Sequence, residues 1–266
     1  MADRHGIVPS RALAQHFLID PNLARAIAAD AGVGPADRVL EIGAGLGSLT
    51  VALAETGASV LAVEFDRALL PALKEVVADA PSVRVVAEDA LHADWPRLLG
   101  DEEPWTVAAN LPYNIAVPVV LRLVQEVPSV VRLVVMVQRE VARRFVAVPG
   151  DGHYGPASLR VAFRCTGSIV RSVPPSVFWP RPRVGSAVVG LDRRARPAVD
   201  VDEPALWRVV DAAFAERRKT VRTALARLGL ARATADAALD TAGVDPSARA
   251  ERLSLDSFAA IARAIA

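Results

Sequence analysis

Short apolar runs alternate with longer one-sided amphipathic segments from residue 38 onward. Runs of strand length occur at residues 39–42, 60–63, 83–87, 106–109 and 132–137. Segments with apolar residues at helical spacing lie between them, at residues 49–55, 69–78 and 118–125. Strands and helices in this order form a parallel sheet, because each helix returns the chain to the same end of the sheet. The pattern therefore predicts an α/β fold, a doubly wound sheet with its functional site at the carboxyl ends of the strands.

A change of pattern near residue 186 predicts a second, smaller domain. Residues 186–191 read as one more strand, and the polar, proline-containing segment 193–203 is typical of a linker. Alanine-rich segments with helical spacing follow, at residues 204–215, 221–228, 231–241 and 255–265. We therefore expect a large α/β domain over residues 1–194 and a small all-helical domain over residues 195–266.

Composition and charge exclude several classes of protein. The chain has 266 residues, 52% of them hydrophobic, and a formal net charge of +1, which describes a packed globular protein. No apolar run has the length of a signal peptide or a membrane span, so neither secretion nor membrane insertion is expected. The single Cys165 has no disulfide partner and no neighbouring zinc ligands, which favours the cytoplasm and predicts no metal site.

A glycine-rich turn follows the first predicted strand. Gly43, Gly45 and Gly47 have the spacing Gly-x-Gly-x-Gly, and Ser48 stands where the dinucleotide fingerprint requires its last glycine. Glycines in such a turn permit positive φ angles and close approach of a ligand to the backbone. On this pattern alone, a ligand-binding turn and an ordinary strand-to-helix turn stay equally open.

Acidic residues end the next two predicted strands. Glu64 lies roughly 20 positions after the glycines, where a carboxylate can accept both hydroxyls of a ribose. Asp89 follows the third strand and can accept a hydrogen bond from an adenine amine. Either acid alone is usual at a solvated strand end. Together with the glycine turn, they predict a nucleoside-binding site at one edge of the sheet.

The fourth strand ends in Asn110-Leu111-Pro112-Tyr113, the most specific motif in the chain. The lone pair of an exocyclic adenine amine is delocalised into the ring, so methylation needs acceptors that hold and aim the amine. The side-chain oxygen of Asn110 and the carbonyl of Leu111, restricted by Pro112, can take its two hydrogens. Tyr113 can stack on a base that has left its helix. The motif predicts methyl transfer to a purine amine, with an ordinary proline turn as the alternative.

Taken together, these segments resemble the ribosomal RNA adenine dimethyltransferases, which modify two neighbouring adenines near the 3′ end of small-subunit rRNA. Further matching segments are Gln15-His16-Phe17-Leu18, Gln138-Arg139-Glu140-Val141, Tyr154-Gly155 and residues 173–180 and 213–220. The resemblance implies a Rossmann-like class I methyltransferase sheet with S-adenosylmethionine as the cofactor. It also implies 16S rRNA within an immature 30S-type subunit as the partner. We expect a monomeric cytoplasmic enzyme that forms N6,N6-dimethyladenosine in the 3′-terminal hairpin.

The resemblance also implies roles for individual residues. The implied cofactor contacts are His16, Leu18, Gly43, Gly45, Glu64, Asp89 and Asn110. Within that set, His16 and Leu18 would contact the methionine or ribose part, and Gly43 the amino acid part. The implied catalytic residues are Asn110, Leu111, Pro112, Tyr113 and Phe178, with Phe178 forming the wall of the base pocket opposite Tyr113.

Three positions depart from the family pattern: His16 replaces the usual asparagine, Ala44 the usual proline and Gly185 a frequent aspartate. An imidazole retains one hydrogen bond, so cofactor affinity is expected to depend on pH through His16.

Two alternative functions stay open: methylation of large-subunit rRNA of the macrolide-resistance type, and a ribosome-assembly factor without catalysis. Tyr154-Gly155 and the basic residues Arg217, Arg218, Lys219 and Arg222 favour the small subunit, although a basic run is also typical of a solvated face.

Overall fold

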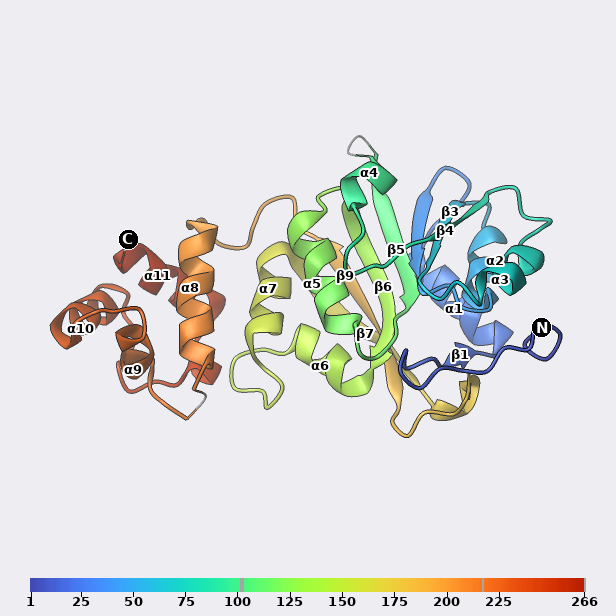
Figure 1. The fold of residues 1–266 in the computed structure, drawn as a ribbon. Helices are drawn as coiled ribbons and strands as arrows, with labels where there is room; N and C mark the ends of the chain where they lie inside the picture. The colour runs from blue at the N-terminus through green and yellow to red at the C-terminus, as the bar shows by residue number, and fades with distance from the viewer. Residues whose placement is uncertain (101–102, 217, 266) are drawn as a thin grey trace. The chain divides into compact units, whose positions relative to one another are not determined.

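The computed structural model describes residues 1–100, 103–216 and 218–265 (Figure 1). Contacts divide the chain into two compact units. The first unit comprises Met1–Arg143 and Thr166–Arg193, and the second comprises Arg144–Cys165 and Arg194–Ala266. At residue 194, where the sequence predicted the domain boundary, the chain passes from the first unit to the second. Residues 144–165, which the sequence assigned to the first domain, instead belong to the second unit.

The first unit contains a seven-stranded sheet with strand order β4-β3-β2-β5-β6-β9-β7 (Figure 1). Its strands are β2 (Arg38–Ile42), β3 (Ser59–Glu64), β4 (Val83–Ala87), β5 (Trp105–Asn110), β6 (Val130–Gln138), β7 (Cys165–Val173) and β9 (Ser186–Arg193). Neighbours from β4 to β6 pair in parallel, and β9 pairs antiparallel with β6. The prediction of a mostly parallel sheet is confirmed, and β7 is an additional strand that the sequence did not predict.

Helices connect the parallel strands. The three predicted helices are α2 (Ser48–Ala54), α3 (Leu70–Val76) and α5 (Ala116–Glu126), and α1 (Pro21–Ala31) and α4 (Trp95–Leu99) are additional. The side chain of Asp20 caps the start of α1, and Gly32 ends it in the left-handed region at φ 67°. Apolar residues of α1, including Ile27, are fully buried in a core cluster with residues of the sheet.

A two-stranded sheet brings together segments that are far apart in the sequence. Strand β1 (Phe17–Leu18) pairs antiparallel with β8 (Phe178–Trp179), which follows the 3₁₀ turn η1 (Pro175–Val177). In this pairing Phe17 lies opposite Trp179, and Leu18 lies opposite Phe178. Figure 1 shows the dark-blue amino-terminal segment beside the gold segment that contains β8. The pairing fixes the chain just before β1 near the strand ends that form the candidate site.

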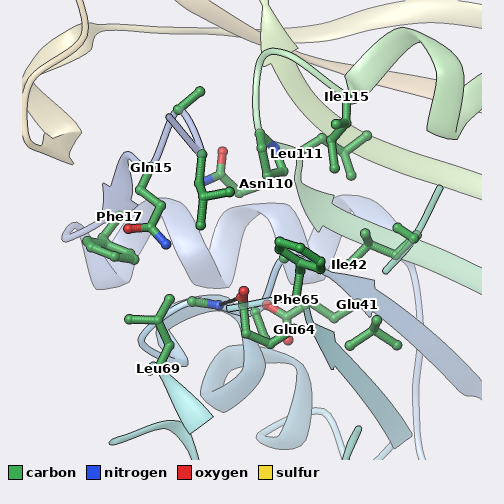
Figure 2. Close-up of a pocket in the computed structure, with 18 of the residues that line it drawn as sticks. Gln15, Phe17, Glu41, Ile42, Glu64, Phe65, Leu69, Asn110, Leu111 and Ile115 are labelled. Carbon is green, nitrogen blue, oxygen red and sulfur yellow. Dashed lines mark hydrogen bonds between the residues drawn. The ribbon is translucent and has the colours of Figure 1, made fainter. Parts of the chain in front are cut away.

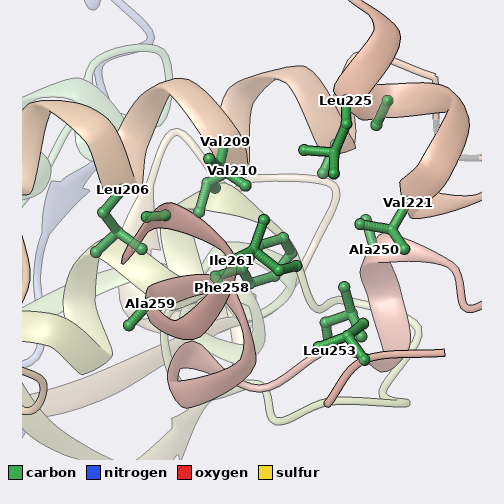
Figure 3. Close-up of a cluster of buried hydrophobic side chains, with 14 of the residues drawn as sticks. Leu206, Val209, Val210, Val221, Leu225, Ala250, Leu253, Phe258, Ala259 and Ile261 are labelled. Carbon is green, nitrogen blue, oxygen red and sulfur yellow. The ribbon is translucent and has the colours of Figure 1, made fainter. Parts of the chain in front are cut away.

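The second unit is helical. It contains α7 (Pro156–Arg164), α8 (Glu203–Phe214), α9 (Val221–Ala226), α10 (Arg232–Thr241), η2 (Ala250–Arg252) and α11 (Leu255–Ala264). The chain first passes from the first unit to the second within α6 (Arg139–Val146). Its core surrounds the buried Leu206 and Phe258 (Figure 3). Tyr154, Leu159 and Phe163 are buried in this same core, which explains why residues 144–165 belong to this unit.

No helix in the described ranges is long and apolar enough to cross a bilayer.

Candidate active site

The carboxyl ends of β2 to β5 and the segment before β1 enclose a cavity of about 240 Å³ in the first unit. Its lining includes residues 13–18, the end of β2 and the turn after it, Glu64 and Phe65 at the end of β3, residues 88–91 after β4, and residues 110–115 at the end of β5. Figure 2 shows Asn110 and Leu111 on one side of this space, and Glu41, Glu64 and Phe65 on the other. The expected position of the site at the strand ends therefore agrees with this cavity.

The glycine turn lies against side chains that leave little room for a Cβ atom. Gly43 and Gly45 have φ angles of 74° and 57°, in the region that favours glycine. A Cβ on Gly45 would lie 3.1 Å from the ring of Phe17, and a Cβ on Gly43 would lie 3.2 Å from Cδ of Pro112. Backbone conformation and close packing therefore both favour glycine at these positions, and both residues line the cavity.

Glu64 is held in place by backbone amides. Its Oε2 accepts a hydrogen bond from the amide of Gly45 at 2.8 Å, and its Oε1 accepts one from the amide of Asp66 at 2.8 Å. Burial raises the pKa of Glu64, and these two amide hydrogen bonds oppose the increase. The residue lies in the cavity wall beside the glycine turn, where the sequence predicted the ribose acceptor.

Glu41 also lines the cavity, and sequence reasoning missed it. Its side chain is 1% exposed, and its Oε2 has no hydrogen-bond partner among the described residues. Burial raises the pKa of Glu41 to about 8; the neighbouring Thr50 hydroxyl opposes this, and the charge of Glu64 adds to it. A buried carboxyl with an unsatisfied oxygen at a cavity wall is suited to a ligand that carries a positive charge or a hydrogen-bond donor.

Asp89 stands at the edge of the cavity formed by β4. Its carboxylate accepts hydrogen bonds from the amide of Leu91 and from Nδ1 of His92, both at 2.9 Å. Burial acts to raise the pKa of Asp89, but the hydrogen bonds from His92 and Leu91 outweigh it, so the pKa is lowered. The carboxylate is therefore ionised and keeps its acceptor character at neutral pH.

The turn after β5 has its polar groups fixed by partners from distant segments. Nδ2 of Asn110 donates to the carbonyl oxygen of His16 at 3.2 Å, which leaves Oδ1 as the acceptor of that side chain. The hydroxyl of Tyr113 hydrogen-bonds with Oγ of Ser186 at 2.8 Å. The rings of His16 and Tyr113 are tilted neighbours with centroids 5.3 Å apart. The structure thus brings Asn110, Tyr113 and His16 together in one wall.

The structure does not bring Phe178 to the cavity. Its side chain is 3% exposed and packs in the core cluster with Leu18 and Ala24, and it is not among the residues that line the cavity, although Leu18 is. Phe178 is held in this core opposite Leu18 by the β1-β8 pairing, and its role as the pocket wall opposite Tyr113 stays a prediction. Phe65, 55% exposed and in the cavity wall, was overlooked; its place directly after Glu64 was the available signal.

No group of histidine, cysteine and acidic side chains suited to a metal ion occurs in the part of the chain that the structure describes. The mostly parallel sheet with the antiparallel strand β9 beside β6, and a cavity at its strand ends, is the architecture expected for a class I methyltransferase.

Comparisons with known proteins agree with this class and indicate one family within it. A family model described as "Ribosomal RNA adenine dimethylase" matches residues 10–266. The "Ribosomal RNA small subunit methyltransferase A" of Thermobifida fusca is 46% identical over 267 residues, covering 98% of this chain and 92% of that protein. The protein of the same name from Moorella thermoacetica is 45% identical over 269 residues, covering 98% and 93%.

Solved structures share the fold over most of their length. A dimethyladenosine transferase from Plasmodium falciparum aligns with a TM-score of 0.78 at 24% identity, covering 92% of this chain and 96% of that one. The 23S rRNA methyltransferase ErmE aligns with a TM-score of 0.69 at 29% identity, covering 93% and 98%. This chain belongs to the ribosomal RNA adenine dimethylase family. The expected fold class and the expected S-adenosylmethionine-dependent methyltransferase activity are thereby confirmed.

Proposed function

We propose that this protein transfers methyl groups from S-adenosylmethionine to the N6 amines of two adjacent adenines in the 3′-terminal hairpin of small-subunit rRNA. One observation carries the proposal: the wall that contains the glycine turn and Glu64 continues directly into the turn Asn110 to Tyr113. A nucleoside-type cofactor and an amine-holding motif therefore share a single cavity.

The cavity has the groups that the cofactor requires. Glu64 supplies the acceptor for ribose hydroxyls, Asp89 the acceptor for the adenine amine, and the backbone at Gly43 and Gly45 the contact for the amino acid part. His16 and Leu18 also line this space. The unpartnered oxygen of Glu41 offers a carboxylate to the positively charged end of this cofactor.

Catalysis rests on orientation of the adenine amine. S-adenosylmethionine supplies a methyl group activated by its sulfonium charge. Since the amide nitrogen of Asn110 is engaged with His16, its Oδ1 accepts one amine hydrogen, and the carbonyl of Leu111 accepts the other. Pro112 restricts the backbone of Leu111, and Tyr113 stacks on the extruded base. No strong general base is needed, because the nitrogen becomes acidic only after it gains the methyl group, and its proton then leaves to solvent.

Two lines of support favour the small ribosomal subunit as the substrate. The curated relatives at 42–46% identity carry the name of a small-subunit methyltransferase, whereas the large-subunit enzyme ErmE is 29% identical. We propose an immature 30S-type subunit as the partner and a monomeric state for the enzyme. We also propose a cytoplasmic location, because such subunits are assembled in the cytoplasm. The non-catalytic assembly factor is disfavoured by the intact Asn110 and Tyr113.

The test uses small ribosomal subunits that lack adenine dimethylation, the full-length protein and labelled S-adenosylmethionine. Mass spectrometry of the nucleosides should detect labelled N6,N6-dimethyladenosine in small-subunit rRNA. Asn110→Ala should abolish the label while binding to the subunits persists, and Asn22→Ala on the exposed face of α1 serves as the matched control. Label in large-subunit rRNA alone, or full activity of Asn110→Ala, would refute the proposal.

A further inference from the structure

We propose that the loop of residues 179–185, between β8 and β9, is a platform for single-stranded RNA that holds the nucleotides next to the target adenine. Trp179 would stack on a base, and Arg181 and Arg183 would contact phosphates. The inference rests on the proposed function, because it supplies the binding surface that an adenine in rRNA needs beside the cavity.

Both ends of this loop are tied to the candidate active site. Near its start, the carbonyl oxygen of Pro180 lies 2.6 Å from Nδ1 of His16. At its end, Oγ of Ser186 hydrogen-bonds with the hydroxyl of Tyr113 at 2.8 Å. His16 and Tyr113 are both in the cavity wall. The loop is therefore at the rim of the pocket on the side of the residue proposed to stack on the adenine.

Trp179 is the aromatic group that this rim presents to solvent. Its ring is stacked with the ring of Phe17, with centroids 6.0 Å apart and an interplanar angle of 27°, and the residue is still 39% exposed. The other tryptophans differ: Trp95 and Trp105 are buried, and Trp207 packs edge-on against Phe163. An exposed indole braced on a buried ring is a rigid surface on which an unpaired base can stack.

The charge of the loop complements a polyanion. Arg181 and Arg183 are exposed, and neither has an ion-pair partner in the ranges that the structure describes. Between residues 166 and 191 the sequence has no acidic residue, and Arg171, the other arginine there, is paired with Asp30. Unpaired guanidinium groups beside an exposed aromatic ring are the combination that binds single strands without sequence preference.

A further cation lies against the end of the loop. The amide of Arg139 donates to the carbonyl oxygen of Gly185 at 3.0 Å. Nη2 of Arg139 occupies the space that a side chain at position 185 would need, since a Cβ there would be 2.7 Å from it. Glycine at position 185 thus lets this exposed guanidinium rest on the backbone. Together with Arg181 and Arg183, it extends the positive rim toward Tyr113.

These features indicate a single strand rather than a duplex. A duplex keeps its bases stacked within the helix and offers a protein mainly its backbone, so an exposed indole gains little from it. An adenine that enters the cavity must already be unstacked, which frees the neighbouring bases for an aromatic surface. Stacking of one such base contributes about 1 to 3 kcal/mol, corresponding to roughly a 5- to 150-fold effect on affinity.

The experiment measures the affinity of the full-length protein for a short, fluorescently labelled, adenine-rich single-stranded RNA by anisotropy. Trp179→Ala should weaken binding by about 5- to 150-fold, and Trp179→Phe should restore most of the affinity because it retains a ring. The RNA should quench tryptophan fluorescence of the wild type but not of Trp179→Phe. Double replacement of Arg181 and Arg183 by alanine should lower the salt slope by about 0.7 for each phosphate that is no longer neutralised. Arg97→Ala, an exposed arginine on α4, is the matched control.

A measurement of S-adenosylmethionine affinity distinguishes an RNA-binding role of Trp179 from a purely structural one. If Trp179 only braced Phe17 over Gly45, Trp179→Ala would weaken cofactor binding and leave RNA affinity unchanged, and the inference would be overturned. Absence of RNA binding by the wild type would also overturn it. Failure of the proposed function gives a different result, namely no label in small-subunit rRNA, while the oligonucleotide measurements still decide the role of the loop.

Discussion

Glu41→Gln should remove the contribution of one buried carboxyl to the pH dependence of stability of the first unit between about pH 5 and pH 8. The folded protein holds this carboxyl with a pKa of about 8, against 4.5 for an ordinary glutamate. Above pH 4.5 the unfolded chain ionises, whereas the folded chain keeps the proton. The folded pKa is raised, so the free energy of unfolding decreases as the pH rises through this interval and levels off above the folded pKa.

The magnitude follows from the two pKa values. Each pH unit between them contributes about 1.4 kcal/mol, so the full interval corresponds to about 5 kcal/mol. Urea unfolding at about pH 5.5 and about pH 7.5 should show a decrease in the wild type that exceeds the decrease in Glu41→Gln by about 3 kcal/mol. Glu126→Gln, an exposed glutamate on α5, should behave as the wild type. Equal decreases in the wild type and Glu41→Gln would refute the assignment.

The same carboxyl links protons to cofactor binding. A cation placed in the cavity stabilises the ionised form of Glu41, so S-adenosylmethionine should release a proton when it binds below pH 8, and its affinity should rise with pH in that range. Calorimetry in buffers of different ionisation enthalpy measures the released protons. Glu41→Gln should release fewer, and an unchanged number would show that this carboxyl does not face the bound cation.

Three further predictions concern packing and charge. Gly45→Ala should destabilise the protein by about 1 to 2 kcal/mol and weaken cofactor binding. The reason is that an L-residue is strained at φ 57° and that its Cβ would lie close to the ring of Phe17. Thermal melting with and without cofactor measures both effects. Tyr154→Phe should cost about 1 kcal/mol of stability by removing the hydrogen bond to the carbonyl of Leu253, without change in methyl transfer at a permissive temperature. Lys219→Ala should lower the salt slope of ribosome binding more than Arg222→Ala, since Arg222 is already paired with Asp236. Slopes unchanged from the wild type in both variants would mean that neither side chain contacts phosphate.

The basic run of the second unit illustrates how structure revises a charge pattern. Arg217, the first residue of this basic run, lies outside the described residues. Arg222 is paired with Asp236, which neutralises part of the charge that the sequence suggested as RNA-binding. Sequence shows which charges are close along the chain. It does not show which of them the fold pairs.

Features of the fold and of the site that depend on residues close together in the sequence were predictable. The apolar runs marked the predicted strands of the sheet because buried parallel strands are continuously hydrophobic. The glycine turn and the motif at Asn110 were found because they depend on residue types at fixed spacing. Glu64 and Asp89 followed from the topology, since parallel strands end at the same edge of the sheet.

Features that depend on long-range contacts were not predictable. Strands β1 and β8 are two residues each and have no periodicity, so their pairing leaves no trace in the sequence, and the inward position of Phe178 follows from that pairing. The membership of α7 in the second unit depends on Tyr154 and Phe163 entering a core formed by later helices. Glu41 was hidden inside a strand, where a single acid between apolar residues gives no indication that it faces a cavity.

The glycine turn and the acceptor turn form one mechanical unit. A Cβ on Gly43 would lie 3.2 Å from Cδ of Pro112 and 3.5 Å from the carbonyl oxygen of Asn110, so the two turns lie close together. The amide of Gly43 also hydrogen-bonds to the carbonyl of Val63 at 2.8 Å, which ties the turn to β3 and hence to Glu64. The proposed cofactor contacts and amine acceptors are therefore placed by neighbouring, closely packed turns. This placement matters because methyl transfer without a strong general base depends on the geometry between donor and acceptor more than on proton transfer.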